Sequence, residues 1–212
     1  MLVRNRMTTE VITLNPDQTL LKAMSLIQQK RIRHLPVVQE GKVVGMVTER
    51  DVRRAGASDS SSLSVFELNY LMDQIKVSSF MSKKVITVSP DEPIEAAAKL
   101  IYDHKIGALP VVEENHLVGL ITKSDILETF IEVLGINKPS VRVELELENR
   151  LGALADTTKI IRELGLYLVS LVTLPEEEGQ KTRGTVIRVS PTDEKKLKDF
   201  LRNAGSPIIS VK

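Results

Sequence analysis

Apolar residues recur in the same order twice in the first part of the chain. Residues 7–52 align without gaps on residues 81–126, and 19 of the 46 aligned positions are identical. In each copy a short β-rich run precedes apolar residues at helical spacing, two apolar runs surround a hairpin-like loop, and a second helix opens at Thr48 or Thr122. The pattern predicts a pair of like modules of order β-α-β-β-α. The predicted strands are Val11–Leu14, Leu35–Val38, Val43–Val47, Val85–Val88, Leu109–Val112 and Leu117–Ile121.

The segments outside the two copies follow other patterns. A Ser-rich stretch at 58–62 precedes a predicted helix, Leu63–Ile75, whose apolar stripe we expect to pack on the pair or on a second copy of the chain. Strict alternation over Val141–Glu148 predicts a strand with one buried face. The pattern continues as helix, strand, strand, helix and strand, which completes the β-α-β-β-α-β order of ferredoxin-like folds. These later strands are predicted at Leu166–Leu174, Thr182–Val189 and Ile208–Val211.

The composition narrows the class of protein. The 212 residues are 42% apolar and 27% charged, and 29 basic residues nearly balance 28 acidic ones, so no bulk charge favours nucleic acid or an anionic membrane. The absence of Cys excludes disulfides and Cys-based zinc sites, and the three His residues share no ligand spacing. No apolar run approaches the ~18–20 residues that span a bilayer, and the first residues lack the apolar core of a secretion signal. We expect a cytoplasmic protein without a bound metal.

Both copies contain the phrase Gly-φ-φ-Thr-x-x-Asp, where φ is apolar, and its Thr and Asp have two interpretations. A Thr at a helix start with an acid three residues later is close to a capping box. The acid is Asp in both copies, however, whereas Glu is usual in that box, and the residues between Thr and Asp change freely. A short carboxylate with two acceptor oxygens suits the paired hydroxyls of a ribose, and the adjoining helix amides suit a phosphate. The two roles are compatible.

These phrases, together with Leu-Pro-Val-Val at 35–38 and 109–112, resemble the CBS domain, which occurs in tandem pairs. The resemblance covers nearly all of residues 1–130. It implies an α/β (α+β) fold in which two CBS domains form a pseudo-two-fold pair. The implied parts are CBS domain 1 at 1–57, a linker and helix at 58–80, and CBS domain 2 at 81–134. The resemblance also implies an adenine nucleotide in clefts that combine the base pocket of one repeat with the Thr and Asp of the other.

Carried over by position, the resemblance assigns nucleotide-binding residues to two clefts. In the first, Ile12, Ile32 and His34 would lie opposite Thr122 and Asp125. In the second, Ile86, Ile106 and Ala108 would lie opposite Thr48 and Asp51. Met46 and Leu120 match a further apolar wall. Arg31 and Lys105 match positions that meet phosphates, although cations at a helix end also complement the helix dipole. Because Arg33-His34 aligns with Gly107-Ala108, we expect the first cleft to be tighter and more polar.

The segment Asn149-Arg150-Leu151-Gly152-Ala153-Leu154 resembles the Asp-x-Pro-Gly-x-Leu turn of the ACT domain. The resemblance implies an ACT domain at 141–212 that binds an amino acid where two copies meet. The residues that would contact this effector are Asn149, Leu151, Gly152 and Ala153. Leu151 replaces the usual Pro, and the alternative role of Gly152 is to permit the strand-to-helix turn. The order of domains resembles that of the AcuB-like (acetoin utilisation) family.

Two hypotheses for the function follow. The first is a non-enzymatic regulatory sensor that binds an adenine nucleotide, with AMP preferred over ATP, ADP or a SAM-like ligand, and signals to an unidentified protein by conformational or oligomeric change. The second is a dimerisation scaffold in which the ACT domain senses an amino acid. Both imply a homodimer or larger assembly without a cofactor, and without a nucleic-acid or membrane partner. The chain has no P-loop, no GxGxxG and no Ser/His/Asp order that would predict an enzyme.

Overall fold

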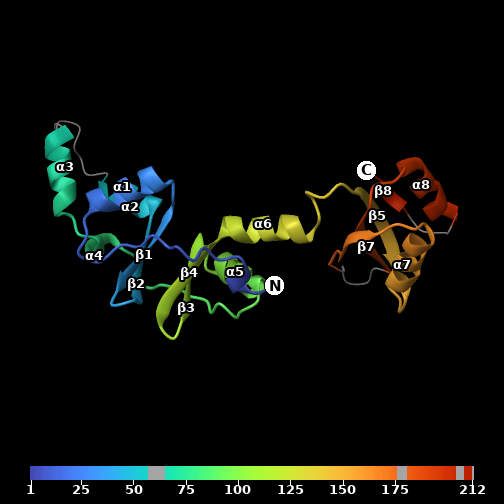
Figure 1. Ribbon diagram of the computed structural model, residues 1–212, viewed down its shortest axis with the longest axis horizontal. Coiled ribbons are helices and arrows are strands. Elements are labelled where there is room, and N and C mark those ends of the chain that lie inside the picture. The colour runs from blue at the N-terminus through green and yellow to red at the C-terminus, as the bar shows by residue number, and fades with distance from the viewer. Residues whose placement is uncertain (57–64, 176–180, 204–207, 212) are drawn as a thin grey trace. The chain divides into compact units, whose positions relative to one another are not determined.

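The computed structural model describes residues 1–56, 65–175, 181–203 and 208–211. The chain forms two compact units, Met1–Ile126 and Leu127–Lys212, and the first unit contains both copies of the repeat up to the first turn of the last helix (Figure 1). The Ser-rich stretch at 58–62 and the first two residues of the predicted helix Leu63–Ile75 lie outside the described residues. Within the described ranges, none of the helices has the length and apolar character needed to cross a membrane.

Each repeat folds as a helix, a two-stranded hairpin and a second helix, so the predicted helices and hairpins are confirmed. The first repeat contains α1 (Leu20–Lys30), β1 (His34–Gln39), β2 (Lys42–Thr48) and α2 (Glu49–Gly56). The second contains α5 (Ile94–Asp103), β3 (Ala108–Glu113), β4 (His116–Thr122) and α6 (Lys123–Val133). A short 3-10 helix, η1 (Val3–Asn5), precedes the first repeat, and α3 (Val65–Gln74) and α4 (Val77–Phe80) precede the second.

The two hairpins turn over two-residue loops of the same type. Glu40 and Gly41 have φ of 51° and 78°, and Glu114 and Asn115 have φ of 47° and 68°. Positive φ at both central residues is the geometry of a type I′ turn, whose twist matches that of paired antiparallel strands. The turn pairs Gln39 with Lys42 and Glu113 with His116. A one-residue bulge further along each hairpin, between Val37 and Val38 and between Val111 and Val112, then shifts the register so that Thr48 lies opposite His34 and Thr122 opposite Ala108.

The predicted first strand of each repeat, Val11–Leu14 and Val85–Val88, is wrong in extent, because prolines limit its pairing. Leu14 forms one parallel bridge with Val37, in which the Leu14 N–H donates to the Pro36 carbonyl at 2.9 Å. Extending the ladder would require an N–H from Pro36 in one direction and from Pro16 in the other, and proline has none. Val88 forms the equivalent bridge with Val111, and the missing N–H groups of Pro110 and Pro90 prevent its extension in the same way.

The segment ahead of each repeat pairs with the hairpin of the other repeat. Thr8 and Leu120 exchange two backbone hydrogen bonds of 2.9 Å, and Met46 and Ser82 exchange two of 2.9 and 3.0 Å. The hydrophobic cores of the two repeats are exchanged in the same way. Val3 is buried among residues of the second repeat, and Val77 among residues of the first. Neither repeat therefore completes its core with its own contiguous sequence.

A small apolar cluster fills the contact between the repeats. Met46, Ala108 and Leu120 are each less than 10% exposed, and Val11 and Val85 pack against them. The strands β2 and β4 lie side by side at this contact (Figure 1). The pseudo-two-fold relation between the repeats thus has an apolar centre.

Only part of the apolar stripe predicted for residues 63–75 packs on the pair. Phe66 and Tyr70 are 87% and 68% exposed, and Leu71 is exposed as well. The side chains that reach the core of the first repeat are Ile75, which belongs to the predicted stripe, and Met72, which does not. The segment therefore packs on its own pair through one end of the stripe, with α3 against α1, and packing of Phe66, Tyr70 and Leu71 on a second copy stays a prediction.

The second unit has the predicted β-α-β-β-α-β order. Its elements are β5 (Val141–Glu148), α7 (Ala153–Glu163), β6 (Leu168–Thr173), β7 (Thr182–Val189), α8 (Glu194–Asn203) and β8 (Ile208–Val211). The sheet order is β6-β7-β5-β8, and all neighbouring strands are antiparallel. Val141, Val143, Leu145 and Leu147 of β5 are buried in alternation, as expected for a strand with one face on the core. The ferredoxin-like order is confirmed, whereas the assignment to the ACT domain stays a prediction.

Gly45 allows the exchanged segment to lie on its hairpin, and an added methyl group tests this approach. A Cβ at Gly45 would lie 2.5 Å from Met81 Sδ and 3.0 Å from its Cγ. We expect Gly45→Ala to lower the free energy of unfolding by about 1–3 kcal/mol through overpacking. In a Met81→Ala background the same change should cost less, since the crowded atoms are gone. Denaturant unfolding measures both, and equal costs in the two backgrounds would contradict the proposed contact.

Thr185 in β7 is buried, and its hydroxyl has no hydrogen-bond partner within the described residues. We expect Thr185→Val to raise the stability of the second unit by about 1 kcal/mol, because it removes an unsatisfied polar group and keeps the shape. The matched control is Thr157→Val, since the buried Thr157 hydroxyl donates to the Ala153 carbonyl at 2.9 Å. This control should lose about 0.5–1.5 kcal/mol. A stability change of the same sign in both variants, measured by thermal unfolding, would count against this account.

Candidate functional site

Two cavities open where the repeats meet. The first cleft has a volume of about 520 Å³, and its lining residues are Thr8, Glu10, Val11, Ile12, Arg31, Ile32, Arg33, His34, Gly107, Leu120, Thr122, Lys123 and Ser124. The second cleft has a volume of about 610 Å³, and its lining residues are Arg33, His34, Met46, Thr48, Glu49, Arg50, Asp51, Arg53, Arg54, Ser82, Lys84, Val85, Ile86, Lys105, Ile106, Gly107, Ala108 and Lys123. Each cleft draws on both repeats.

The structure brings most of the predicted residues together in the expected crosswise combination. The predicted residues around the first cleft are Ile12, Arg31, Ile32 and His34 from one repeat, with Leu120 and Thr122 from the other. Those around the second cleft are Ile86, Lys105, Ile106 and Ala108, with Met46, Thr48 and Asp51. Asp125 is the exception, because Lys123 and Ser124, rather than Asp125, line that side of the first cleft.

The Thr and Asp of the repeated phrase form a reciprocal cap in both copies. The backbone N–H and the hydroxyl of Thr48 donate to Asp51 Oδ2 at 2.9 and 2.7 Å, and the Asp51 N–H approaches the Thr48 hydroxyl at 3.3 Å. Thr122 and Asp125 repeat the pattern at 2.7, 2.8 and 3.4 Å. The capping interpretation is therefore present in the structure, and it holds each carboxylate in one orientation at the start of its helix.

The cap leaves part of the Asp51 carboxylate available to a ligand. Its Oδ2 is occupied by the cap, whereas Oδ1 has no hydrogen-bond partner among the residues that the structure describes. A carboxylate oxygen with free lone pairs on a cavity wall can accept hydrogen bonds from a hydroxyl group. The second cleft thus has the acceptor that a sugar contact requires. The carboxylate of Asp125 accepts from the Thr122 hydroxyl in the same way, but Asp125 does not line the first cleft.

Arg31 and Lys105 occupy equivalent positions with an unusual backbone. Both follow the first helix of their repeat and have left-handed φ, 52° and 54°. Such a conformation is uncommon for residues other than glycine. It places the two side chains on the walls of the first and the second cleft, respectively. Each cleft thus has one basic residue at the same place.

A shared wall separates the clefts. Arg33, His34, Gly107 and Lys123 line both of them. The His34 ring lies so close to Gly107 that a Cβ there would collide with Nε2. Burial, followed by the charges of Arg33 and Lys123, lowers the pKa of His34 below its usual value, which favours the neutral ring. The first cleft is the smaller one, as expected, but the expectation that it is the more polar one is wrong, because Arg33 and His34 serve both clefts and α2 adds charge to the second.

The residues that the sequence did not reveal come mainly from α2 and from the extended segments ahead of the repeats. Arg50, Arg53 and Arg54 recur at helical spacing on one face of α2, a signal visible in the sequence. Glu10 and Lys84 carry no such signal, because their position depends on the exchange between repeats. Within the described residues, no group of three His, Cys, Asp or Glu side chains could hold a metal ion.

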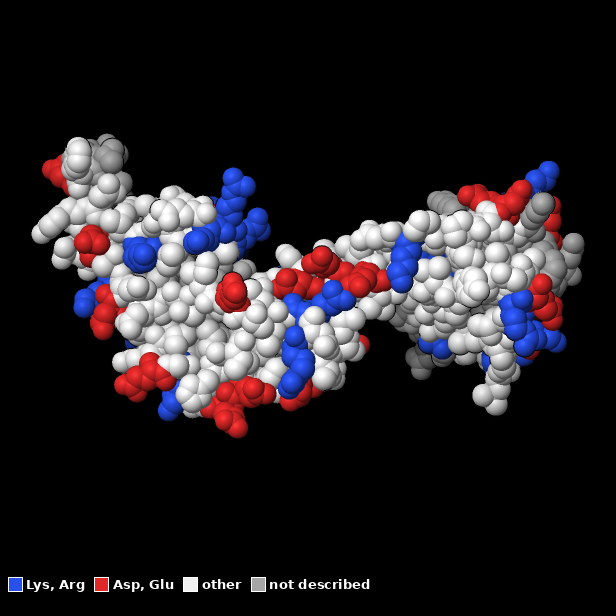
Figure 2. Space-filling model, in the orientation of Figure 1, with Lys and Arg blue, Asp and Glu red and all other residues white. Residues whose placement is uncertain are grey.

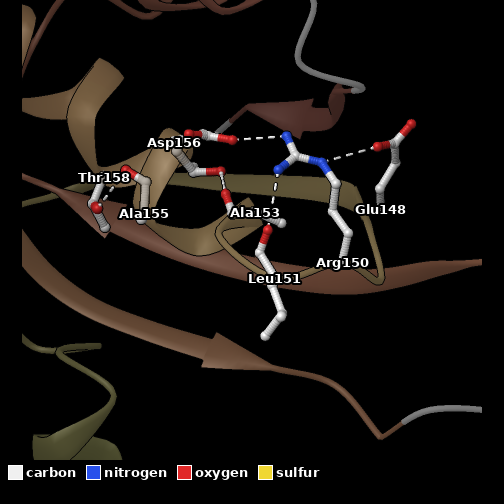
Figure 3. Close-up of polar contacts among 8 residues, drawn as sticks. Glu148, Arg150, Leu151, Ala153, Ala155, Asp156 and Thr158 are labelled. Carbon is white, nitrogen blue, oxygen red and sulfur yellow. Dashed lines mark hydrogen bonds and ion pairs between the residues drawn. The ribbon is translucent and has the colours of Figure 1, made fainter.

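The turn that precedes α7 is held by Arg150 (Figure 3). Its guanidinium donates to Glu148 at 3.1 Å, to Asp156 at 2.7 Å and to the Leu151 carbonyl at 3.3 Å. Gly152 has φ of 86°, and the nearest atom to an added Cβ would be 3.8 Å away. Glycine is thus required at position 152 by the backbone conformation and not by a neighbouring atom lying close to its Cα. This supports the interpretation that Gly152 permits the strand-to-helix turn.

The other predicted effector residues lie around the same turn. The Asn149 N–H donates to the Lys181 carbonyl at 2.9 Å, Leu151 is fully exposed, and Ala153 is the first residue of α7. A cavity of about 440 Å³ in this unit lies at the other end of α7, between Thr158 and Leu168, and contains none of the four. An amino-acid site at the turn therefore stays a prediction.

Comparison with known proteins agrees with the doubled architecture. The family model for the CBS domain matches residues 3–58 and 77–132. The chain is 33% identical over 124 residues to the CBS domain-containing protein YhcV of Bacillus subtilis (strain 168), which covers 58% of this chain and 81% of that protein. It is 37% identical over 130 residues to homoserine O-acetyltransferase of Methanococcus vannielii, but this covers only 24% of the enzyme. The match to that enzyme is thus a match to a part of it.

Solved structures show the same fold over the repeats. A protein from Vibrio cholerae named for acetoin utilization (AcuB) superposes with a TM-score of 0.55 at 32% identity, covering 65% of this chain and 96% of that one. The CBS domain pair of the protein MJ0100, solved in complex with 5′-methylthioadenosine and S-adenosyl-L-methionine, gives a TM-score of 0.51 at 27% identity, covering 61% and 95%. With both repeats matched by the family model and assembled into one unit, the chain belongs to the CBS domain family.

Proposed function

We propose that the chain is a non-enzymatic regulatory protein that senses an adenine nucleotide, with AMP as the first candidate, in the clefts of its CBS pair. The observation that carries the proposal is the composition of the clefts, because each combines an apolar wall from one repeat with a capped Thr from the other. The adenosyl ligands of the MJ0100 pair support the choice of ligand class.

The second cleft offers a contact for each part of such a ligand. The adenine would lie against Ile86, Ile106 and Ala108, where an apolar surface can cover both faces of the base. The ribose hydroxyls would donate to Asp51 Oδ1, whose direction the cap already fixes. The first phosphate would meet Lys105. A fixed acceptor binds more tightly than a mobile one, because less conformational freedom is lost on binding.

Binding becomes a signal because the ligand bridges the repeats. A molecule that contacts both repeats has a binding free energy that depends on their relative arrangement, and it stabilises the arrangement that it fits best. A ligand with equal affinity for all arrangements would shift nothing. The readout would be a change in the packing of the pair, or of two copies of the chain, which an unidentified partner protein recognises.

The first test is a thermal-shift panel of AMP, ADP, ATP, S-adenosylmethionine and the common amino acids. A ligand at 100-fold over its Kd should add ~2.7 kcal/mol to the free energy of unfolding. For a chain of this size the midpoint should rise by roughly 5–10 °C. A response to an adenine nucleotide is expected. If only an amino acid stabilises the chain, the CBS pair is a scaffold and the sensing runs through the second unit.

The second test separates the cap from the ligand contact at Asp51. Asp51→Asn keeps a side-chain oxygen for the Thr48 cap but removes the charge, so the stability of the free protein should change little. Nucleotide binding should weaken about 10-fold, since hydrogen bonds to charged groups contribute ~1.5–3 kcal/mol. Asp51→Ala should lower both. Isothermal titration calorimetry with AMP and with ATP measures the binding, and unchanged affinity for both nucleotides in both variants would restrict Asp51 to capping.

A further inference from the structure

The two copies of the repeat differ in charge at positions around the clefts. On the wall of the second cleft these positions hold Arg50, Arg53, Arg54 and Lys84. The aligned positions of the other copy hold Ser124, Leu127, Glu128 and Glu10. Two of the four differences, at Arg54 and Lys84, are reversals of charge. Two copies of one fold have thus kept the same motif residues and diverged around them.

The divergence concentrates basic residues on one cleft. Apart from Arg33 and Lys123, which line both clefts, the second cleft has five basic residues on its wall, the four named above and Lys105, against two acidic ones, Glu49 and Asp51. The first cleft has only Arg31, together with the acidic Glu10. The helices show the same contrast. Acidic side chains gather over α6 in Figure 2, whereas the equivalent helix α2 contains three arginines.

Most of these cations are available to an anion. Arg53 is paired with Glu49 at 2.8 Å. Arg50, Arg54, Lys84 and Lys105 form no ion pair with any residue in the described ranges, and all four are exposed. Like charges around one concave surface raise its positive potential and attract a multiply charged anion. The planar guanidinium of arginine also binds phosphate oxygens in a bidentate manner.

From this divergence we propose that the second cleft selects a nucleoside polyphosphate, whereas the first cleft takes a ligand with one phosphate or none. Lys105 and Arg31 hold the same place in the two clefts and serve the first phosphate in each. Arg50, Arg54 and Lys84 have no basic counterpart and hold the further phosphates. The proposal rests on the proposed function, because it requires the adenosine group to lie between the Ile86 and Thr48 walls.

The experiment is a calorimetric titration of the full chain with adenosine, AMP and ATP in a buffer with a metal chelator, so that only the protein's own cations act. The wild type should bind ATP at one site per chain at least ~10-fold more tightly than AMP. The double variant Arg54→Glu, Lys84→Glu carries the residues of the other copy. It should lose at least ~10-fold in ATP affinity and keep adenosine affinity within about 2-fold.

The matched control is Glu10→Lys, which makes the reciprocal change in the first cleft. It should leave the tight ATP site unchanged and strengthen ATP binding at the other site.

An AMP affinity equal to that of ATP in the wild type would overturn the proposal. A parallel loss of adenosine affinity and ATP affinity in a folded double variant would also overturn it. If circular dichroism shows that the double variant is unfolded, Arg50→Ser carries the same test. Adenosine binding without a preference for ATP would defeat this proposal alone, whereas the absence of any adenosine or nucleotide binding would defeat the proposed function as well.

Discussion

Backbone bridges hold the repeats together, and two of those in the described residues join the leading segment of one repeat to the hairpin of the other. The bridges between Thr8 and Leu120 and between Met46 and Ser82 place Val11 and Val85 on the apolar cluster at the centre of the pair. The residues that follow, Ile12 and Ile86, then reach the walls of the two clefts. The exchange therefore assembles the core and the clefts at once, and residues of one repeat reach the Thr of the other only because of it.

The carboxylate of the repeated Thr-x-x-Asp phrase can both stabilise a helix and contact a ligand. The cap uses one oxygen of each carboxylate to start a helix, and in the second cleft the other oxygen of Asp51 is left on the cavity wall. In the first cleft the equivalent Asp125 does not line the cavity. The duplication thus preserved the structural role of the phrase in both copies, whereas the surroundings of the two caps became different.

The sequence predicted the parts of the fold that depend on local patterns. The hairpins, their connecting turns, the helices and the β-α-β-β-α-β order at the end of the chain follow from periodicity and turn residues. The crosswise combination of cleft residues came from the resemblance to a family. The single-residue bridges at Leu14 and Val88 were missed because the prolines that limit them lie on the partner segment as well as on their own. The roles of Lys84 and of the shared His34–Gly107 wall were missed because they depend on which segments meet in space.

The reciprocal exchange also determines how the pair can be divided. Because Val3 completes the core of the second repeat and Val77 that of the first, cutting the backbone between α2 and α3 would yield two pieces that each lack part of a core and carry the missing part of the other. Such pieces should reassociate, as the halves of a split reporter do, because association completes both cores. The same arrangement gives two intact chains a low-cost route to trade their leading segments and so become an interlocked dimer.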